Sequence, residues 1–222
     1  QALNVSIRCI LDPGDEAIVL TPAWPNGASI AALIGAKPIQ IAQPLEGNRF
    51  TIDFVAMEAA ITPRTKLLLY TSPSNPLGWV ATVEEQQQLL DFARRHKLWL
   101  LADEVYERLT YGVEIAPSIL RLTQPDDAVF VVQSFSKAYC MTGWRLGWVA
   151  GRKDLVQRAT ELNEFMVSCP AGFTQRAAET ALVDGESFVI GLRAQLRANR
   201  DYCVGMLSQV EGVHIPSPEG AF

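Results

Sequence analysis

The stretch LWLLADEVYERL, residues 98–109, decides how this chain of 222 residues folds. A continuous apolar run ends in two acids, Asp103 and Glu104, and Tyr106 follows three residues after the first acid. Short apolar runs without alternation are typical of strands covered on both faces, as in a parallel sheet. A carboxylate at the end of such a strand needs a positive or hydrogen-bonding partner, which a ligand can supply. We therefore predict a buried strand whose last residue, Asp103, lies in a ligand site. The alternative is that Asp103 only caps a helix and that Tyr106 only fills the core.

Other apolar runs share this character and alternate with helical patterns. Thr82-Val-Glu-Glu85 is a capping box and predicts a helix that ends at about His96. Pro170 suits the first turn of a second helix, which runs toward Val183. Alternation of strand and helix indicates the α/β class, here a mostly parallel sheet flanked by helices. The further predicted strands are EAIVLTP (16–22), KPIQIAQ (37–43), KLLLYTSP (66–73) and AVFVVQSFS (128–136).

The end of the chain predicts a change of domain. Apolar residues recur at three- and four-residue steps over 188–210, and EGVHIPSPEGAF (211–222) is typical of a strand that enters a new unit. We expect the boundary within the long helix, at about residues 190–205. Residues 1–197 would then form a large domain that lacks its N-terminal part, and 198–222 would begin a smaller α+β domain.

Composition excludes several function classes. Nineteen Lys and Arg stand against 24 Asp and Glu, a net charge of −5, without a basic block, so no nucleic-acid surface is expected. No apolar run is long enough for a membrane span, and no secretory signal is visible. His96 and His214 are the only histidines and lie far apart, which argues against a metal site or a serine triad. Four cysteines without a C-x-x-C pair are interpreted as reduced core thiols of a cytoplasmic protein: Cys9, Cys140, Cys169 and Cys203.

Two further strand exits carry unusual residues, and ligands of open α/β sheets bind at such exits. TSPSNPLG (71–78) contains Asn75 in a tight turn, which turn chemistry alone would explain. TPAWPNG (21–27) holds Trp24 between two prolines. A loop tryptophan more often covers a core, but a rigid indole between prolines also suits stacking on a flat heterocycle.

The stretch SFSKAYCMTGWRLGWVAG (134–151) places two cations among aromatic residues that favour burial. Burial disfavours the charged form of a lysine, so Lys137 would be an amine nucleophile toward an aldehyde. Arg145, with the hydroxyls of Ser134 and Ser136, is a donor set suited to a phosphate. The alternative, a satisfied lysine and a surface arginine, explains neither the serines nor the glycines beside the arginine. An aldehyde and a phosphate on one ligand point to pyridoxal phosphate, which needs a lysine and an acid beside its ring nitrogen.

With SNPLG (74–78), ADEVY (102–106) and SFSKAYCMTGWRLGW (134–148) in this order, the chain resembles the class I aminotransferases. These are fold-type I pyridoxal-phosphate enzymes related to aspartate aminotransferase. The resemblance covers nearly the whole chain and implies the large domain of such an enzyme. It also implies pyridoxal 5′-phosphate as the cofactor, amino-group transfer between an L-amino acid and a 2-oxo acid, and a homodimer.

The resemblance assigns roles around the cofactor ring. Lys137 would form the Schiff base and later move a proton between Cα and C4′. Asp103 would keep the pyridine nitrogen protonated, which makes the ring an electron sink. Asn75 and Tyr106 would hydrogen-bond the phenolate oxygen of the ring and thereby lower the pKa of the imine.

The remaining roles concern the phosphate and the ring face. Arg145 and Ser134 would hold the phosphate, with Ser136 as a further helper, and Trp24 would stack on the ring. The resemblance also suggests cis peptide bonds before the prolines of Thr21-Pro22 and Asn75-Pro76.

Two elements of the family pattern fall outside the chain, and three alternatives stay open. The family's glycine-containing phosphate loop would precede Gln1, and its substrate-carboxylate arginine would follow the terminal PEGAF. A β-lyase or a decarboxylase of the same fold would use the same Lys137 and Asp103. A pyridoxal-phosphate-sensing domain of a transcription regulator would fit too, and a basic helix-turn-helix segment ahead of the chain would distinguish it.

Overall fold

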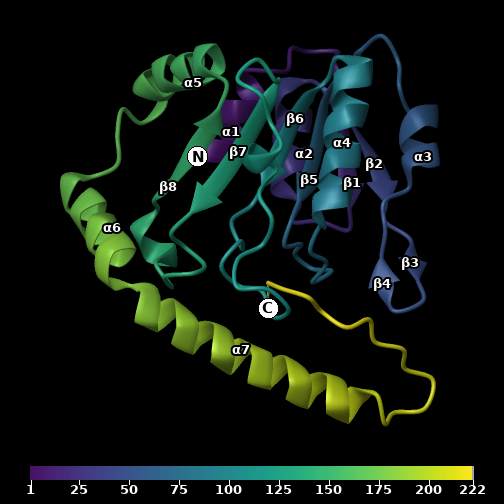
Figure 1. Ribbon diagram of the computed structural model, residues 1–222. Helices are drawn as coiled ribbons and strands as arrows, with labels where there is room; N and C mark the ends of the chain where they lie inside the picture. The colour runs from purple at the N-terminus through teal and green to yellow at the C-terminus, as the bar shows by residue number, and fades with distance from the viewer. Residues whose placement is uncertain (222) are drawn as a thin grey trace.

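The computed structural model describes residues 1–221 and shows a six-stranded sheet with helices on both faces (Figure 1). Its strands are β1 (Glu16–Thr21), β2 (Lys37–Ala42), β5 (Thr65–Thr71), β6 (Trp99–Asp103), β7 (Val129–Ser134) and β8 (Gly147–Gly151). Their order is β2-β1-β5-β6-β7-β8, with β8 antiparallel to β7 and the other pairs parallel. A separate antiparallel pair consists of β3 (Leu45–Glu46) and β4 (Arg49–Phe50). The predicted α/β class with a mostly parallel sheet is confirmed.

Seven helices in the described chain accompany the strands. They are α1 (Ala2–Arg8), α2 (Asn26–Ile34), α3 (Phe54–Ala59), α4 (Val83–His96), α5 (Lys153–Met166), α6 (Gly172–Asp184) and α7 (Glu186–Leu207), with short 3₁₀ turns η1 (Ile119–Arg121) and η2 (Thr142–Trp144). Of these helices, α2, α3 and α4 lie in connections between strands, α1 precedes the first strand, and α5, α6 and α7 follow the last one. Within residues 1–221, none of the helices combines the length and the apolar character needed to cross a membrane.

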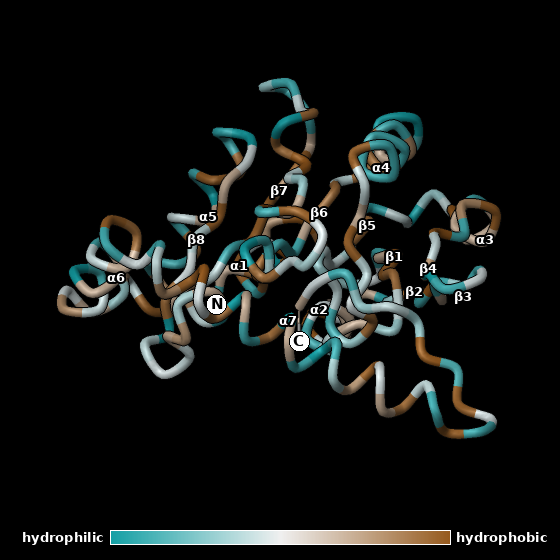
Figure 2. Tube along the Cα trace, turned by 60° about the horizontal axis from the view of Figure 1, so that its bottom comes forward, coloured by the Kyte–Doolittle hydropathy of each residue, from teal (hydrophilic) through white to brown (hydrophobic). Residues whose placement is uncertain are grey.

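Both faces of the sheet are buried because successive residues of each strand contribute to different cores. In β1, Ile18 and Leu20 pack into the core under α3 and α4, whereas Ala17 and Val19 pack into the core under α1, α2 and α5. The hydrophobic colour in Figure 2 gathers along the strands at the centre of the molecule. This two-sided burial explains why the strands are continuous apolar runs in the sequence.

The five strands predicted for the sheet are all present, and β8 is the strand of this sheet that the prediction missed; the short pair β3 and β4 was not predicted either. β8 begins and ends with glycines that lie against β7: a Cβ on Gly147 would stand 2.3 Å from the carbonyl oxygen of Gln133, and one on Gly151 would stand 2.3 Å from that of Val129. Glycine is therefore needed where the two backbones approach closely. The sequence pattern alone attributed this region to a phosphate-binding motif.

The predicted helix starts are confirmed at α4 and shifted at α6. The Thr82 hydroxyl accepts a hydrogen bond from the Glu85 N–H at 3.1 Å, and the Glu85 carboxylate accepts one from the Thr82 N–H at 2.8 Å. This is the expected capping box. α6 begins at Gly172, two residues after Pro170, whose carbonyl accepts a hydrogen bond from the side chain of Gln175 at 2.8 Å.

Two predictions about the end of the chain and the cysteines are wrong. In the described residues 211–221 there is no strand, and Gly220 forms a single antiparallel bridge to Thr110. Two prolines in this segment remove backbone donors that a strand would need. The free cysteines Cys140, Cys169 and Cys203 are exposed rather than in the core. The first two lie in loops and Cys203 lies in the largely exposed helix α7, whereas Cys9 is half-buried.

α7 runs along the carboxyl ends of the central strands, and the segment that follows it returns to that same edge (Figure 1). The helix is continuous from Glu186 to Leu207. The division into a large domain (1–197) and the start of a small one (198–222) stays a prediction.

Candidate active site

The sheet brings the predicted site residues to one edge. β1, β5, β6 and β7 are neighbours, so their carboxyl ends lie side by side, with Thr71 opposite Asp103 and Asp103 opposite Val132. Asn75 follows the end of β5, Asp103 is the last residue of β6, and Lys137 follows the end of β7. Parallel strand order therefore gathers residues that are up to 62 positions apart in sequence.

Asp103 ends β6, and the peptide group that joins it to Glu104 is bonded to the neighbouring chain segments on both sides. Its carbonyl accepts a hydrogen bond from the Ser72 N–H at 3.0 Å, and the N–H of Glu104 bonds the Val132 carbonyl at 3.0 Å. Its carboxylate accepts a hydrogen bond from the Val105 N–H at 3.3 Å. Burial raises the pKa of the Asp103 carboxyl to about 6, although the Val105 N–H and the charge of Lys137 oppose this increase. The position is rigid, and its environment favours a cationic partner.

Asn75, Tyr106 and Lys137 form a contiguous group. The Asn75 amide donates a hydrogen bond to the Tyr106 hydroxyl at 3.2 Å, and the Lys137 Nζ lies 5.3 Å from the centre of the Tyr106 ring. Tyr106 is buried, and Lys137 is half-buried rather than fully buried as predicted. A turn over residues 104–109 brings Tyr106 to the same edge as Asp103, as the spacing of the two residues suggested.

The predicted phosphate-binding residues divide into two groups. The Ser134 hydroxyl accepts a hydrogen bond from the Ser136 N–H at 3.0 Å and donates one to the Leu146 carbonyl at 3.4 Å, so it shapes the turn before Lys137. Ser136 is buried and lines a pocket together with Lys137. Arg145 is exposed, adopts a left-handed backbone (φ 54°) and donates a hydrogen bond to the Thr142 carbonyl at 2.7 Å.

The surroundings of Arg145 differ from the predicted buried, aromatic environment. Trp144 and Trp148 are 44% and 38% exposed, because η2 and the outer edge strand β8 carry them at the surface. The loop tryptophan Trp24 is 59% exposed, so it does not cover the core.

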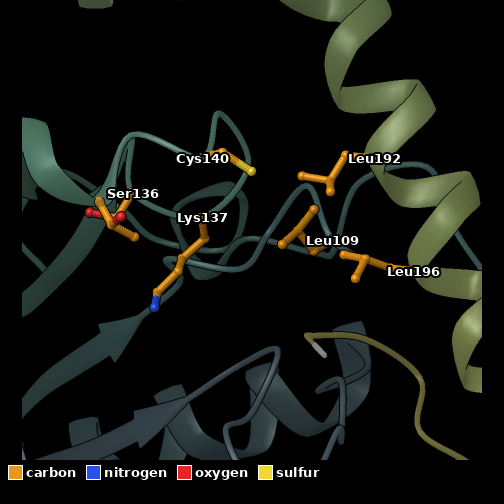
Figure 3. Close-up of a pocket in the computed structure, with 7 residues that line it drawn as sticks. Leu109, Ser136, Lys137, Cys140, Leu192 and Leu196 are labelled. Carbon is orange, nitrogen blue, oxygen red and sulfur yellow. The ribbon is translucent and has the colours of Figure 1, made fainter.

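A pocket of about 270 Å³ opens between the Lys137 turn and α7 (Figure 3). In Figure 3 the amine of Lys137 points away from the leucines on the other side of the pocket. Sequence reasoning did not assign the remaining lining residues, which come from three separate segments: Leu109, Cys140, Thr142, Leu192 and Leu196. No local motif marks them, because only the path of α7 across the sheet edge brings them together.

The structure also distinguishes the two neighbouring acids of the ADEVY motif. Glu104 is 1% exposed and points into the protein, where its carboxylate accepts a hydrogen bond from the Ile119 N–H at 2.9 Å. Burial raises its pKa to about 7. Glu104 therefore links β6 to η1, and Asp103 is the acid left at the site.

The three cis peptide bonds of the described chain flank this edge. Thr21–Pro22 and Asn75–Pro76 are cis as expected from the resemblance, and Ser72–Pro73 is cis as well.

Comparison with known proteins agrees with this geometry. The family model for aminotransferase classes I and II matches residues 1–222. The chain belongs to the class I and II aminotransferases. Enzymes of this family depend on pyridoxal phosphate.

Several relatives within this family cover the entire chain. The aspartate aminotransferase of Streptomyces avermitilis is 38% identical over 224 residues, and the aspartate/prephenate aminotransferase of Cereibacter sphaeroides is 35% identical over 230 residues. Among solved structures, an aspartate aminotransferase mutant of Thermus thermophilus has a TM-score of 0.92 at 34% identity, and the aromatic aminotransferase of Pyrococcus horikoshii has 0.93 at 32%. The chain is covered completely in each case, but it spans only 54% and 56% of the first two proteins and 57% and 60% of the latter two.

The residues of this aminotransferase chain fit its family's cofactor. The Asp103 carboxylate, whose pKa burial raises to about 6, would be stabilised by a protonated ring nitrogen. The paired side chains of Asn75 and Tyr106 present polar atoms at the same edge of the sheet, and Lys137 supplies an amine close to the Tyr106 ring. A carboxylate, a hydrogen-bonding pair and an amine at one edge form the donor set that pyridoxal phosphate requires.

Proposed function

We propose that the protein is a pyridoxal-phosphate-dependent aminotransferase that moves an amino group between an L-amino acid and a 2-oxo acid. The names of its relatives support this reaction, since they include aspartate, aspartate/prephenate and aromatic aminotransferases. We further propose that it acts as a homodimer in the cytoplasm, in line with the family resemblance.

One observation carries the proposal: an acid and an amine stand at the exits of adjacent strands, with a hydrogen-bonded amide and phenol nearby. Asp103 ends β6, and Lys137 follows the end of β7, close enough for its charge to oppose the rise in the Asp103 pKa. Asn75 and Tyr106 are bonded at 3.2 Å. A structural role alone does not explain a carboxylate held at a buried strand end next to an amine and a phenol.

Each residue would have a separate task. The bound cofactor supplies an electron sink for the electrons released at the substrate Cα. Asp103 would hold a proton on the ring nitrogen, and Lys137 would attach the aldehyde and accept or return a proton through its Nζ. Asn75 and Tyr106 would bond the ring oxygen.

The other residues would fix the position of the ligand. Ser134, Ser136 and Arg145 would bind its phosphate, and the exposed indole of Trp24 would cover one ring face.

The test compares the full-length protein, reconstituted with pyridoxal phosphate, with its Lys137→Ala variant. We expect a visible absorption band that changes when an amino acid is added, and transfer of the amine to 2-oxoglutarate or pyruvate. Lys137→Ala should lose the band and lower turnover by about 100- to 10,000-fold, the usual contribution of a positioned acid–base group. Lys153→Ala, a substitution of an exposed lysine at the start of α5, is the matched control and should behave as wild type.

Three results would contradict this proposal: no band after reconstitution, unchanged turnover of Lys137→Ala, or release of ammonia with pyruvate or of carbon dioxide in place of amine transfer. The last outcome would assign the site to a lyase or a decarboxylase of the same fold.

A further inference from the structure

The segment 218–221 binds two loops of the active site at once. The N–H groups of Glu219 and Gly220 both donate to the carbonyl of Gly78, at 2.7 and 3.0 Å, in the loop that holds Asn75. On the other side, the Glu219 carbonyl accepts a hydrogen bond from the Tyr111 N–H at 2.9 Å, just beyond the turn that holds Tyr106. The segment therefore joins the two loops whose side chains, Asn75 and Tyr106, are hydrogen-bonded to each other.

Further contacts of the segment reinforce its link to the second loop. The Ala221 N–H donates to the Leu109 carbonyl at 2.8 Å, and the Tyr111 hydroxyl donates to the Ala221 carbonyl at 2.9 Å. Arg200 of α7 donates to the Pro218 carbonyl at 2.7 Å and lies over the Tyr111 ring. The segment is thus held by backbone and side-chain groups on both sides.

Close packing makes this position precise. A Cβ on Gly78 would lie 2.7 Å from the Cβ of Pro218, and Gly78 has a left-handed backbone (φ +67°). A Cβ on Gly220 would lie 2.8 Å from the carbonyl oxygen of Leu109 and 3.0 Å from the Cβ of Pro73. The two glycines allow the segment to lie directly against both loops, so a shift of the segment must move the loops as well.

The side chain of Glu219 anchors the segment through a charged network. Its carboxylate pairs with the Nε of Arg49 at 3.2 Å and accepts a hydrogen bond from the Val80 N–H at 3.0 Å. Arg49 also binds Glu85 through two hydrogen bonds, at 2.6 and 2.8 Å, and donates to the Val80 carbonyl at 2.8 Å. Glu85 is part of the capping box of α4, so the network connects the segment to the start of that helix.

We propose that Glu219 is a positioning residue that holds Asn75 against the hydroxyl of Tyr106, through the segment that it anchors. The proposal rests on the proposed function, because these two side chains would bond the ring oxygen of the cofactor. Glu219 touches neither the cofactor site nor the reacting atoms, and it acts on the Asn75 loop through Gly78 and Val80. Placement to within a fraction of an ångström matters for such a site.

The test measures how the visible absorption of the reconstituted full-length protein depends on pH. Hydrogen bonds to the ring oxygen favour the reactive form of the bound cofactor at neutral pH, so loss of Glu219 should raise the pH midpoint of the spectral transition. We expect Glu219→Ala to raise it by about one pH unit, a tenfold change in proton affinity. Glu219→Gln, which keeps an oxygen acceptor for the Val80 N–H, should give a smaller shift.

Controls separate positioning from stability and from charge. Glu211→Gln removes an exposed acid ahead of the segment and should leave the midpoint unchanged. Arg49→Met, which leaves the hydrogen bond from the Val80 N–H to Glu219 in place, should shift the midpoint in the same direction but less than Glu219→Ala. The double variant should shift it no further than Glu219→Ala, because that variant has already lost the contact with Arg49. Melting temperatures are measured for all variants, so that a general loss of stability is recognised.

The outcomes also distinguish this proposal from the proposed function. An unchanged midpoint in Glu219→Ala would overturn the positioning role, whether or not the melting temperature falls. An equal shift in Glu211→Gln would overturn it too, since the effect would then reflect net charge. Unchanged turnover of Lys137→Ala would instead overturn the proposed function and, with it, the role of Glu219.

Discussion

Replacing Asp103 with asparagine should stabilise the cofactor-free protein, because it removes a charge from a site that disfavours it. Burial raises the pKa of this carboxyl from 3.8 to about 6. At about 1.4 kcal/mol for each tenfold change in proton affinity, this difference corresponds to about 3 kcal/mol of unfolding free energy. Since the side chain is not completely shielded from solvent, about 3 kcal/mol is an upper value, and we expect 1–3 kcal/mol.

The sign of the pH dependence follows from where the proton binds. Below pH 3.8 the carboxyl is protonated in both the folded and the unfolded protein, so its raised pKa costs no stability there. Between about pH 4 and 6 the folded protein binds more protons than the unfolded chain, and the unfolding free energy of the wild type falls as pH rises. Above about pH 6 the full cost is present. The asparagine variant does not have this contribution at any pH.

The assay is urea unfolding of cofactor-free wild type and Asp103→Asn at pH 4 to 8, with Asp126→Asn as a matched control at an exposed position. The stability advantage of Asp103→Asn should be small at pH 4 and reach 1–3 kcal/mol at pH 8. Saturating pyridoxal phosphate should reverse the order. A ligand at about 1,000 times its dissociation constant adds about 4.1 kcal/mol to the protein that binds it, which exceeds the expected advantage, and the variant binds it weakly.

Two results would refute this reasoning. If Asp103→Asn had no advantage at pH 8, burial of the Asp103 charge would not limit the stability of the site. If its advantage were the same at pH 4 and pH 8, the effect would come from packing rather than from ionisation.

Three further substitutions test the framework of the site. Thr82→Ala should cost about 1 kcal/mol in urea unfolding, because the α4 capping box loses its acceptor, and a cost near zero would mean that the box does not contribute. Leu89→Ala should cost about 2–5 kcal/mol in the same assay, since this fully buried side chain fills the core between α4 and the sheet, and a cost below 1 kcal/mol would contradict its assignment to that core. Gly147→Ala should lower the melting temperature and weaken cofactor binding, because its Cβ would meet the Gln133 carbonyl at 2.3 Å, whereas Gly143→Ala, with open space around it, should change neither.

Prediction from the sequence succeeded for elements that neighbouring residues specify, namely the buried strands and the start of α4. Two-sided burial produces apolar runs, so the five parallel strands were found, and the capping box of α4 was found from Thr82 and Glu85. The antiparallel strand β8 was missed because it directly follows Arg145, in a stretch that was interpreted as a phosphate-binding motif. The prediction of a strand in 211–221 was wrong, because the backbone groups of this segment bond two separate loops instead of a neighbouring strand.

The sequence by itself determined the fold class, the family and the chemical types of the site residues, since these depend on apolar periodicity and on short motifs. Only the tertiary structure decided that Glu104, the second acid in ADEVY, points into the protein and bonds η1, because the direction of each side chain depends on the sheet and on η1. It also decided that α7 closes one side of the Lys137 pocket and that Glu219 reaches Arg49 and Val80. Such contacts join residues 50 to 170 positions apart, and no local pattern encodes them because their energy depends on the packing of the whole chain.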